Sequence, residues 1–289
     1  MVLLDKRRST LGVTFAMAVQ LKFWGVRGSI ACPGPDTIRY GGNTPCVEVR
    51  CGEHTLILDG GTGLRPYGDA LLKAGATLDA DLFLTHCHLD HVSGLPFFAP
   101  LFAKNHHLRI WAGNLPATIS IKQALRTMMS PPLFPIDVES FQARMEYRDF
   151  HPGDALEPRP GVTLRTGMLN HPGGSIGYRL ECQGKVIAYL TDTEMPANTD
   201  NAALSLARDA DLLIFDTTYT EAEIATRRGW GHSTWQDGVR LAEAARVRTL
   251  CMFHHDPGHD DAFMDRHGAE SAAARPGTIV AREGLVIDL

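Results

Sequence analysis

The chain has 289 residues, 44% of them hydrophobic, which is enough apolar surface for one large domain or two small ones. Its 28 basic and 33 acidic residues give a formal net charge of −5 with no block of lysine and arginine, which argues against a long nucleic acid as partner. No apolar run approaches the roughly 20 residues that a membrane-spanning helix needs.

The N-terminal residues give an ambiguous signal. A basic stretch at 6–8 and an apolar run at 11–19 resemble a short signal peptide, but Gly12 and Thr14 interrupt the run and a strand-like segment follows at once. We therefore expect residues 1–16 to form a disordered leader and residues 17–289 to form a single domain.

The six cysteines are scattered along the chain without paired spacing, at positions 32, 46, 51, 87, 182 and 251. This pattern is typical of free thiols in a reducing compartment and not of a disulfide framework. We therefore expect a cytoplasmic protein.

Short strands alternate with glycine turns in the first third of the chain. The predicted strands are 19–24, 46–51, 54–59 and 80–85, and the turn between Cys51 and His54 predicts that the second and third form a hairpin. Two helices are predicted in the same part, at 64–74 and, disturbed by prolines, at 92–104.

The remainder of the chain repeats this order of strands followed by helices. Predicted strands are 107–112, 146–150, 162–168, 176–182, 185–191, 211–216 and 249–253, and predicted helices are 115–129, 201–209 and 235–245. Two such halves predict an α/β fold (α+β in some schemes) of two packed sheets with helices on the outside.

Four side chains able to bind metal follow the apolar strand 80–85. His86 and His88 lie two residues apart and would point the same way in extended chain, so they can bind one cation together. Asp90 and His91 begin the next turn and face elsewhere, which suits a second ion. Imidazole and carboxylate are ligands that Zn²⁺ and similar divalent ions prefer. A solvated histidine-rich loop is the alternative.

Three further strand ends offer ligands. His171 follows the strand 162–168, and Asp192 ends the strand 185–191, where its carboxylate could bridge two cations. The strand 249–253 ends in two histidines, of which strand alternation favours His254 over His255. A turn histidine or a capping carboxylate is the alternative at each place. Together they are consistent with one rim of ligands.

A glycine-flanked histidine, His232, stands in the motif Gly229-Trp-Gly-His-Ser-Thr-Trp235 just before a predicted helix. Ser233 or Thr234 would cap that helix, whereas an exposed imidazole near a helix start can meet an anion. Asp216, at the end of the strand 211–216, could bind this imidazole and favour its protonated form.

The order of these motifs resembles the metallo-β-lactamase fold over roughly residues 17–260. The motifs are Trp24-Gly-Val-Arg-Gly-Ser29, Gly41-Gly-Asn-Thr44, Leu58-Asp-Gly-Gly-Thr-Gly63, Thr85-His-Cys-His-Leu-Asp-His91, His171, Asp192, Gly231-His-Ser-Thr234 and Phe253-His-His-Asp-Pro257. Within that superfamily the chain is similar to the phosphodiesterase branch, which includes ribonuclease Z and cyclic-phosphate phosphodiesterases.

The resemblance implies a four-layer αββα sandwich of two mixed sheets, a pair of metal ions and a role for each motif. The ions would be Zn²⁺, with Mn²⁺ or Fe²⁺ as alternatives. One would bind to His86, His88 and His171, the other to Asp90, His91 and His254, with Asp192 bridging them. His232 would contact the scissile phosphate, with Asp216 as its acidic partner.

Pocket residues are suggested by proximity to the motifs. Arg27, a guanidinium between glycines, could pair with phosphate or could cap backbone carbonyls, and Asn43 is a second candidate for substrate binding. Trp24, Phe134 and Trp230 also lie close to the motifs, although a place in the core is the more usual role for the first two.

These observations together predict a dinuclear metal-dependent hydrolase. Two dications would lower the pKa of a shared water, and the resulting hydroxide, oriented by Asp90 or Asp192, would attack a small phosphodiester such as a cyclic nucleotide or cyclic phosphate. The alternatives are a carboxyl-group hydrolase acting on a β-lactam, lactone or thioester, and a tRNA 3′ processing nuclease, for which no tRNA-clamping arm is evident. A homodimer is a further expectation that the sequence leaves open.

Overall fold

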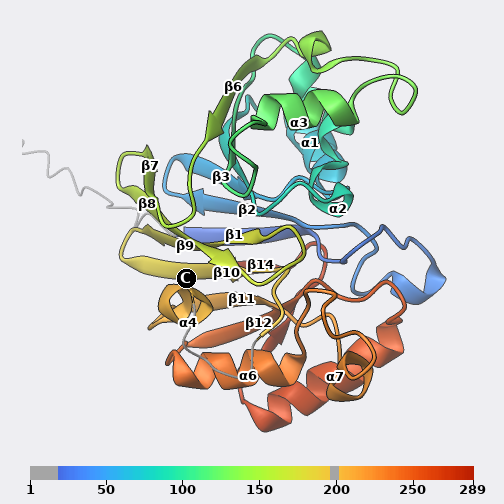
Figure 1. Ribbon diagram of the computed structural model, residues 1–289, viewed down its shortest axis with the longest axis vertical. Coiled ribbons are helices and arrows are strands. Elements are labelled where there is room, and N and C mark those ends of the chain that lie inside the picture. The colour runs from blue at the N-terminus through green and yellow to red at the C-terminus, as the bar shows by residue number, and fades with distance from the viewer. Residues whose placement is uncertain (1–18, 196–201) are drawn as a thin grey trace, which may run out of the picture.

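The computed structural model describes residues 19–195 and 202–289 and consists of two packed seven-stranded sheets with helices on both outer faces (Figure 1). The predicted four-layer sandwich is thereby confirmed. The leader expected at 1–16 lies outside the described residues. Among the described residues, no helix has both the length and the hydrophobicity to cross a bilayer.

The first sheet is antiparallel over its N-terminal strands and parallel from β3 onward, because the β2–β3 connection is a tight turn and the later connections are long crossovers. Its spatial order is β14 (Val286–Asp288), β1 (Val19–Gly25), β2 (Cys46–Cys51), β3 (His54–Leu58), β4 (Asp79–Leu84), β5 (His107–Ala112) and β6 (Arg144–Asp149). The predicted hairpin of β2 and β3 is confirmed.

The second sheet has the same division, with antiparallel strands on one side of β10 and parallel strands on the other. Its spatial order is β13 (Ile279–Val280), β12 (Thr249–Phe253), β11 (Leu212–Asp216), β10 (Lys185–Leu190), β9 (Ser175–Cys182), β8 (Val162–Leu169) and β7 (Ala155–Arg159). Strand β11 is buried along its whole length, as expected for a parallel strand covered on both faces.

Helices cover the outer face of each sheet (Figure 1). On the first sheet these are α1 (Leu64–Lys73), α2 (Leu89–Val92) and α3 (Ile121–Met128), and on the second α4 (Ala202–Ala207), α6 (Trp235–Ala244) and α7 (Asp261–Ala274). The shorter helices are α5 (Glu221–Ile224) and the 3₁₀ turns Pro35–Thr37, Leu95–Phe97, Ala99–Phe102 and Val138–Ser140.

The apolar core has three layers, one between the sheets and one under each set of helices. The central layer contains aromatic side chains from both sheets, with Phe23 against Phe253 at 5.9 Å between ring centroids and Tyr189 against Phe253 at 5.7 Å. This packing fixes the two sheets relative to each other and so fixes the ends of their strands.

Two helix predictions were wrong in extent. Residues 92–104 form the end of α2 and two 3₁₀ turns, because Pro96 and Pro100 remove backbone donors and disfavour a continuous helix. The helix expected from residue 115 begins only at Ile121, where Ser120 and Gln123 form a capping box. Helix α7 was not predicted.

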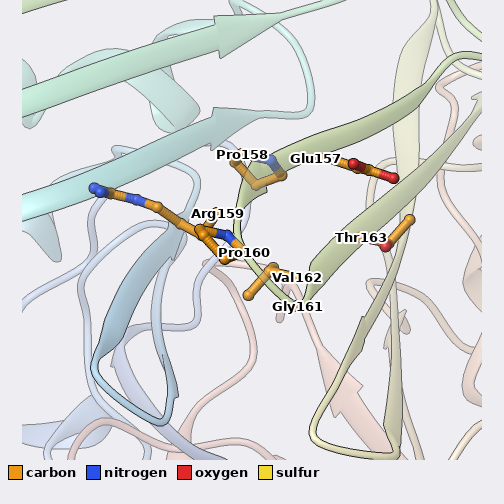
Figure 2. Close-up of a pocket in the computed structure, with 7 residues that line it drawn as sticks. All are labelled: Glu157, Pro158, Arg159, Pro160, Gly161, Val162 and Thr163. Atoms are coloured by element: carbon orange, nitrogen blue, oxygen red, sulfur yellow. The ribbon is translucent and has the colours of Figure 1, made fainter.

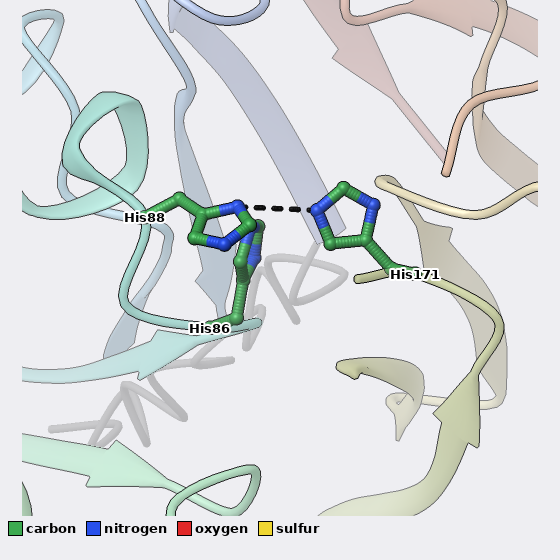
Figure 3. Close-up of side chains that lie close together, drawn as sticks. All are labelled: His86, His88 and His171. Carbon is green, nitrogen blue, oxygen red and sulfur yellow. Dashed lines mark hydrogen bonds between the residues drawn. The ribbon is translucent and has the colours of Figure 1, made fainter. Parts of the chain in front are cut away.

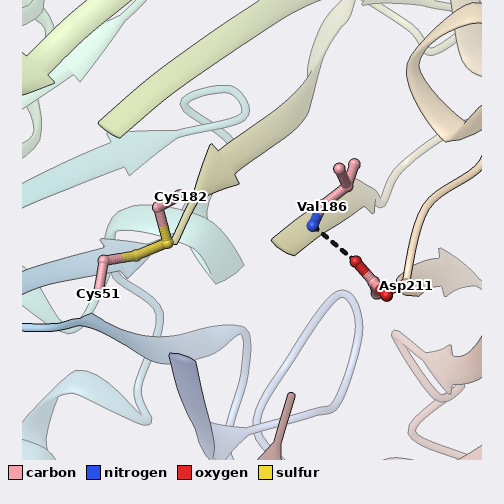
Figure 4. Close-up of a disulfide and its surroundings, with 4 residues drawn as sticks. All are labelled: Cys51, Cys182, Val186 and Asp211. Atoms are coloured by element: carbon pink, nitrogen blue, oxygen red, sulfur yellow. Dashed lines mark hydrogen bonds between the residues drawn. A yellow bond between two sulfur atoms is a disulfide. The ribbon is translucent and has the colours of Figure 1, made fainter. Parts of the chain in front are cut away.

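The expectation of six free thiols is also wrong, because Cys51 and Cys182 form a disulfide (Figure 4). Cys51 ends β2 in the first sheet and Cys182 ends β9 in the second, with 6.2 Å between their Cα atoms. The two cysteines are 131 residues apart, so no local spacing announces the pair. The other four cysteines are free.

Reduction of this disulfide should lower the free energy of unfolding by about 2–4 kcal/mol, because the bond closes a long loop in the unfolded chain. Urea denaturation with and without dithiothreitol measures the difference. The Cys51→Ser variant provides the control, since its stability should not respond to dithiothreitol. Equal stability of the oxidised and reduced wild-type protein would contradict the prediction.

Candidate metal centre

The histidines and carboxylates singled out in the sequence meet at the ends of strands from both sheets. Most of them end or follow β4, β10, β11 and β12 or lie in the turn between β8 and β9, and His232 lies in the loop before α6. Three strand-end residues have left-handed backbone, Asp59 with φ 60°, Asp192 with φ 55° and His254 with φ 62°. Such conformations are costly for residues other than glycine and cluster at functional sites.

Three histidines form the first ligand group (Figure 3). Nδ1 of His88 lies 2.8 Å from Nε2 of His86 and 3.1 Å from Nε2 of His171, so three ring nitrogens converge on one point. Burial lowers the pKa of His86 and of His171 and favours their neutral, metal-binding form. His88 is exposed, so the group is open to solvent on that side.

Asp90, His91, Asp192 and His254 form the second group, and all four are buried. Nε2 of His91 lies 3.2 Å from both Asp90 Oδ2 and Asp192 Oδ2, and Nε2 of His254 lies 3.1 Å from Asp192 Oδ2. Neither Nε2 atom makes a hydrogen bond. Buried ring nitrogens without partners, facing two carboxylates, are the arrangement that a cation would complete.

The two oxygens of Asp192 face different groups. Oδ1 lies 3.8 Å from Nε2 of both His86 and His171, whereas Oδ2 faces His91 and His254. Burial alone would raise the pKa of Asp192, but His254, His91 and His86 outweigh it and hold that pKa well below its usual range. Its carboxylate therefore lies between two groups of side chains that could each hold a metal ion.

The remaining ring nitrogen of each buried ligand histidine is held by a second residue. Such contacts select the tautomer that leaves Nε2 available for metal. The contacts are His86 with Thr85 Oγ1 at 3.1 Å, His91 with Asp59 Oδ2 at 2.9 Å, His171 with the carbonyl of Gly231 at 2.9 Å, and His254 with Thr218 Oγ1 at 3.1 Å.

Asp59 is a site residue that the sequence reasoning did not single out. It is fully buried and accepts hydrogen bonds from His91, from the amide of Thr85 at 2.8 Å and from the hydroxyl of Tyr189 at 2.9 Å. Tyr189 belongs to β10, so this carboxylate joins the two sheets directly below the histidines. The sequence did contain a signal for this role, because Asp59 directly follows an apolar strand and precedes Gly60.

His232 and Asp216 form a buried pair beside both groups. Nδ1 of His232 lies 2.8 Å from Asp216 Oδ2, and the His232 ring stacks on His254 at 5.0 Å between centroids. Burial by itself would lower the pKa of His232, but Asp216 and, more weakly, Asp192 raise it to about 9. His232 is thus predominantly protonated near pH 7 in the metal-free protein.

The two predicted substrate contacts, Arg27 and Asn43, have partners within the protein. Arg27 is 0% exposed, and its guanidinium donates to the carbonyls of Gly41 at 2.7 Å and His259 at 2.6 Å, which is the capping alternative. The Asn43 amide donates to Glu283 at 3.1 Å and its Oδ1 accepts from Thr62 at 3.0 Å. Both side chains thus hold loops together, and Nη2 of Arg27 is buried without a hydrogen-bond partner.

The choice between the adjacent histidines falls on His254. His255 is fully buried with its Nε2 2.8 Å from the carbonyl of Ala281, and its ring packs edge-on against Tyr40. Burial, assisted by Arg27, lowers the pKa of His255 to about 3. His255 therefore serves the core and lies outside the ligand groups.

A pocket of about 440 Å³ lies elsewhere, at the turn between β7 and β8 (Figure 2). Its cationic residue, Arg159, is already paired with Asp79 and Asp81, each at 2.6 Å. None of the histidines of the two ligand groups lines this pocket. The chemistry of the molecule therefore lies at the strand ends and not in this cavity.

The donor set fits a pair of divalent cations. Its five imidazoles and two carboxylates are the ligands that zinc and similar ions prefer, and most are buried. Asp90, Asp192 and Asp59 also raise the pKa of His91 well above its usual value although burial opposes this, so the site attracts positive charge.

Comparisons with known proteins agree with this geometry. The beta-lactamase superfamily domain matches residues 54–255. Ribonuclease Z of Haloarcula marismortui is 23% identical over 287 residues, covering 82% of this chain and 86% of that protein.

Solved structures show the same fold. A diphosphatase of the PhnP family has a TM-score of 0.67 at 19% identity, covering 94% of this chain and 98% of the other. The short form of human tRNase Z has a TM-score of 0.65 at 19% identity, covering 93% and 98%. The chain thus belongs to the beta-lactamase superfamily and is a metal-dependent hydrolase with the metallo-β-lactamase fold.

Proposed function

We propose that this hydrolase is a dinuclear phosphodiesterase acting on a small phosphodiester, such as a cyclic nucleotide or a nucleoside cyclic phosphate. The observation that supports it most is the His232–Asp216 pair beside the two ligand groups. A protonated imidazole next to two cations presents positive charge from several directions, and a phosphodiester is an anion that such a site stabilises.

The metal ligands follow from the two groups. His86, His88 and His171 would hold one ion, and Asp90, His91 and His254 the other, with Asp192 between them. Zn²⁺ suits this mixture of imidazole and carboxylate, and Mn²⁺ and Fe²⁺ are the alternatives. When bound, the pair supplies Lewis acidity and lowers the pKa of a coordinated water to about 7.

The chain's own residues would position and protonate the reacting groups. Asp90 accepts a hydrogen bond from the amide of Ser29 at 2.8 Å. This contact holds the Asp90 carboxylate toward the ligand groups, where it can orient the attacking water. His232 donates from Nδ1 to Asp216, so its Nε2 is the nitrogen left for the substrate. A proton on that nitrogen can stabilise the phosphoryl oxygens or pass to the leaving alkoxide.

The names of the relatives support a phosphodiester as the bond that is cleaved, and they make RNA the second candidate substrate. The net charge of −5 favours the smaller substrate, since a polymer of phosphates is bound mainly through basic side chains. The scissile group of a lactam or thioester is neutral before attack, whereas that of a phosphodiester already carries the negative charge that protonated His232 could contact.

Metal analysis of the purified protein followed by a substrate screen tests the proposal. The screen compares 2′,3′-cyclic nucleotides and bis(p-nitrophenyl) phosphate with a precursor tRNA, nitrocefin and a thioester. We expect two metal ions per chain and turnover of the small diesters. Turnover confined to the tRNA would move the assignment to RNA processing, and turnover confined to nitrocefin or the thioester would overturn it.

Replacement of Asp59 by alanine should destabilise the protein and weaken metal binding. The change leaves His91, Thr85 and Tyr189 without a buried partner, which should cost about 3–5 kcal/mol of unfolding free energy. Loss of the carboxylate behind a metal-binding imidazole should lower metal affinity by about 10–100-fold. Chemical denaturation and competition with a metal chelator measure the two effects.

The milder Asp59→Asn variant separates the two effects, because asparagine keeps the shape and can still accept hydrogen bonds. It should retain more stability than the alanine variant while still binding metal more weakly than wild type. Unchanged metal affinity in both variants would show that Asp59 does not act through His91.

A cytoplasmic location is a further proposal, and the disulfide of Cys51 and Cys182 makes it a testable one. Both cysteines are buried in the folded protein, so cells have to be quenched in acid and their thiols alkylated in denaturant before mass spectrometry. This procedure should label both cysteines if the protein resides in a reducing compartment. Protection of this pair alone would place the protein in an oxidising one.

A further inference from the structure

An exposed tryptophan is fixed beside the first ligand group. Trp230 is 60% exposed, although large aromatic side chains are usually buried. The carbonyl of the next residue, Gly231, lies 2.9 Å from Nδ1 of His171. Adjacent Cα atoms are about 3.8 Å apart, so the backbone of Trp230 is one residue away from a contact with a proposed metal ligand.

The loop that holds Trp230 has little freedom to move. The amides of Gly229 and Gly231, on either side of it, donate to the same Glu194 oxygen at 2.7 Å and 3.2 Å. Both glycines have positive φ, and a Cβ on Gly231 would lie 2.3 Å from the His171 ring. An exposed aromatic ring on a clamped loop loses little entropy when it binds a ligand.

Two more exposed apolar side chains lie one residue from the ligand groups. Leu89, 68% exposed, separates His88 from Asp90. Ile30 is 65% exposed and follows Ser29, whose amide holds Asp90. Three exposed side chains near the ligands are thus apolar, while the exposed polar residue Asn170 donates to the carbonyl of Glu194 at 2.9 Å. The cation beside the tryptophan loop, Arg228, is paired with Glu194 at 3.7 Å.

We infer that Trp230 is a specificity-determining residue that stacks on the nucleobase of a nucleotide phosphodiester. The inference rests on the proposed phosphodiesterase function. A buried charged centre would contact the phosphate, while the apolar surface at Trp230, Leu89 and Ile30 would take the flat organic part of the substrate. Any of the bases can stack on an aromatic side chain, so we expect a preference for substrates that contain a nucleobase but little discrimination among the bases.

Two diesters with the same leaving group test the inference on the metal-loaded full-length protein. The p-nitrophenyl ester of thymidine 5′-monophosphate has a base, and methyl p-nitrophenyl phosphate has none. The Trp230→Ala variant should lose about tenfold in kcat/KM on the thymidine ester, mainly through KM, and stay within about twofold of wild type on the methyl ester. The Trp230→Phe variant should restore most of the loss.

The matched control is Leu72→Ala, which removes an exposed apolar side chain from α1, a helix that contributes no ligand. This variant should have the same kcat/KM as wild type on both esters. The inference is overturned if Trp230→Ala changes both esters equally, changes neither, or lowers metal content, since the last result would indicate a structural role. Failure of the wild-type protein to cleave either ester would instead refute the proposed function, and the inference with it.

Discussion

The Asp192→Ala variant should lose both metal ions and fall below detectable hydrolysis. The two oxygens of Asp192 face different ligand groups, 3.8 Å from His86 on one side and 3.1 Å from His254 on the other, so its removal opens both sites together. Without metal, the pKa of the attacking water rises from about 7 back toward that of bulk water, and hydroxide becomes scarce at neutral pH. Metal analysis and turnover of bis(p-nitrophenyl) phosphate measure the two losses.

Asp69→Ala is a suitable control, because Asp69 is an exposed carboxylate on α1 whose weak ion pair with Arg65 spans 3.8 Å. It should keep full metal content and rate. A second variant, His86→Ala, should lower the occupancy of one ion more than the other. If Asp192→Ala kept two ions per chain, Asp192 would not be a bridging ligand.

The His232→Ala variant should keep its metal ions and lose about 10²–10⁴-fold in turnover of a nucleoside diester. Its imidazole is paired with Asp216, and each of the two ligand groups has at least three donors without it, although His232 also lies within two further groups able to hold a cation. The loss should be much smaller for a p-nitrophenyl ester, whose leaving group needs little help from an acid. Comparison of the two leaving groups, with metal content measured on the same samples, distinguishes proton donation from loss of metal.

The pH dependence of the rate gives a second measure of this role. The pKa of His232 is raised to about 9 in the metal-free protein, and two nearby cations would lower it. Since only the protonated imidazole donates, the rate on poor leaving groups should fall as pH rises through that pKa, at or below about pH 9. The His232→Gln variant should lack this alkaline decline, whereas His151→Ala, at an exposed histidine, should retain it.

Much of the site could be predicted because its ligands are carried by short local motifs. His86, His88, Asp90 and His91 are close in sequence, and the other ligands directly follow apolar strands whose ends meet in space. The structure places His254, and not His255, in the second ligand group. The alternation used to favour it stops at Phe253, because His254 itself has left-handed backbone.

The contacts that the sequence did not reveal share a cause, which is that each joins a side chain to a partner far away along the chain. Arg27 donates to carbonyls more than 200 residues away, and Asn43 pairs with Glu283 near the C-terminus. The partner of Asp59, Tyr189, lies 130 residues along the chain. The disulfide of Cys51 with Cys182 likewise depends on how the sheets pack.

The hydrogen bond from Tyr189 to Asp59 has a consequence for how such a protein could change its substrate. This bond runs from one half of the sandwich to the other and ends on the carboxylate that orients His91. A shift of one sheet relative to the other would therefore move Asp59 and disturb the orientation of the His91 imidazole. New specificities have to arise in segments outside the two sheets, such as the 31 residues 113–143 between β5 and β6, while the halves themselves stay in register.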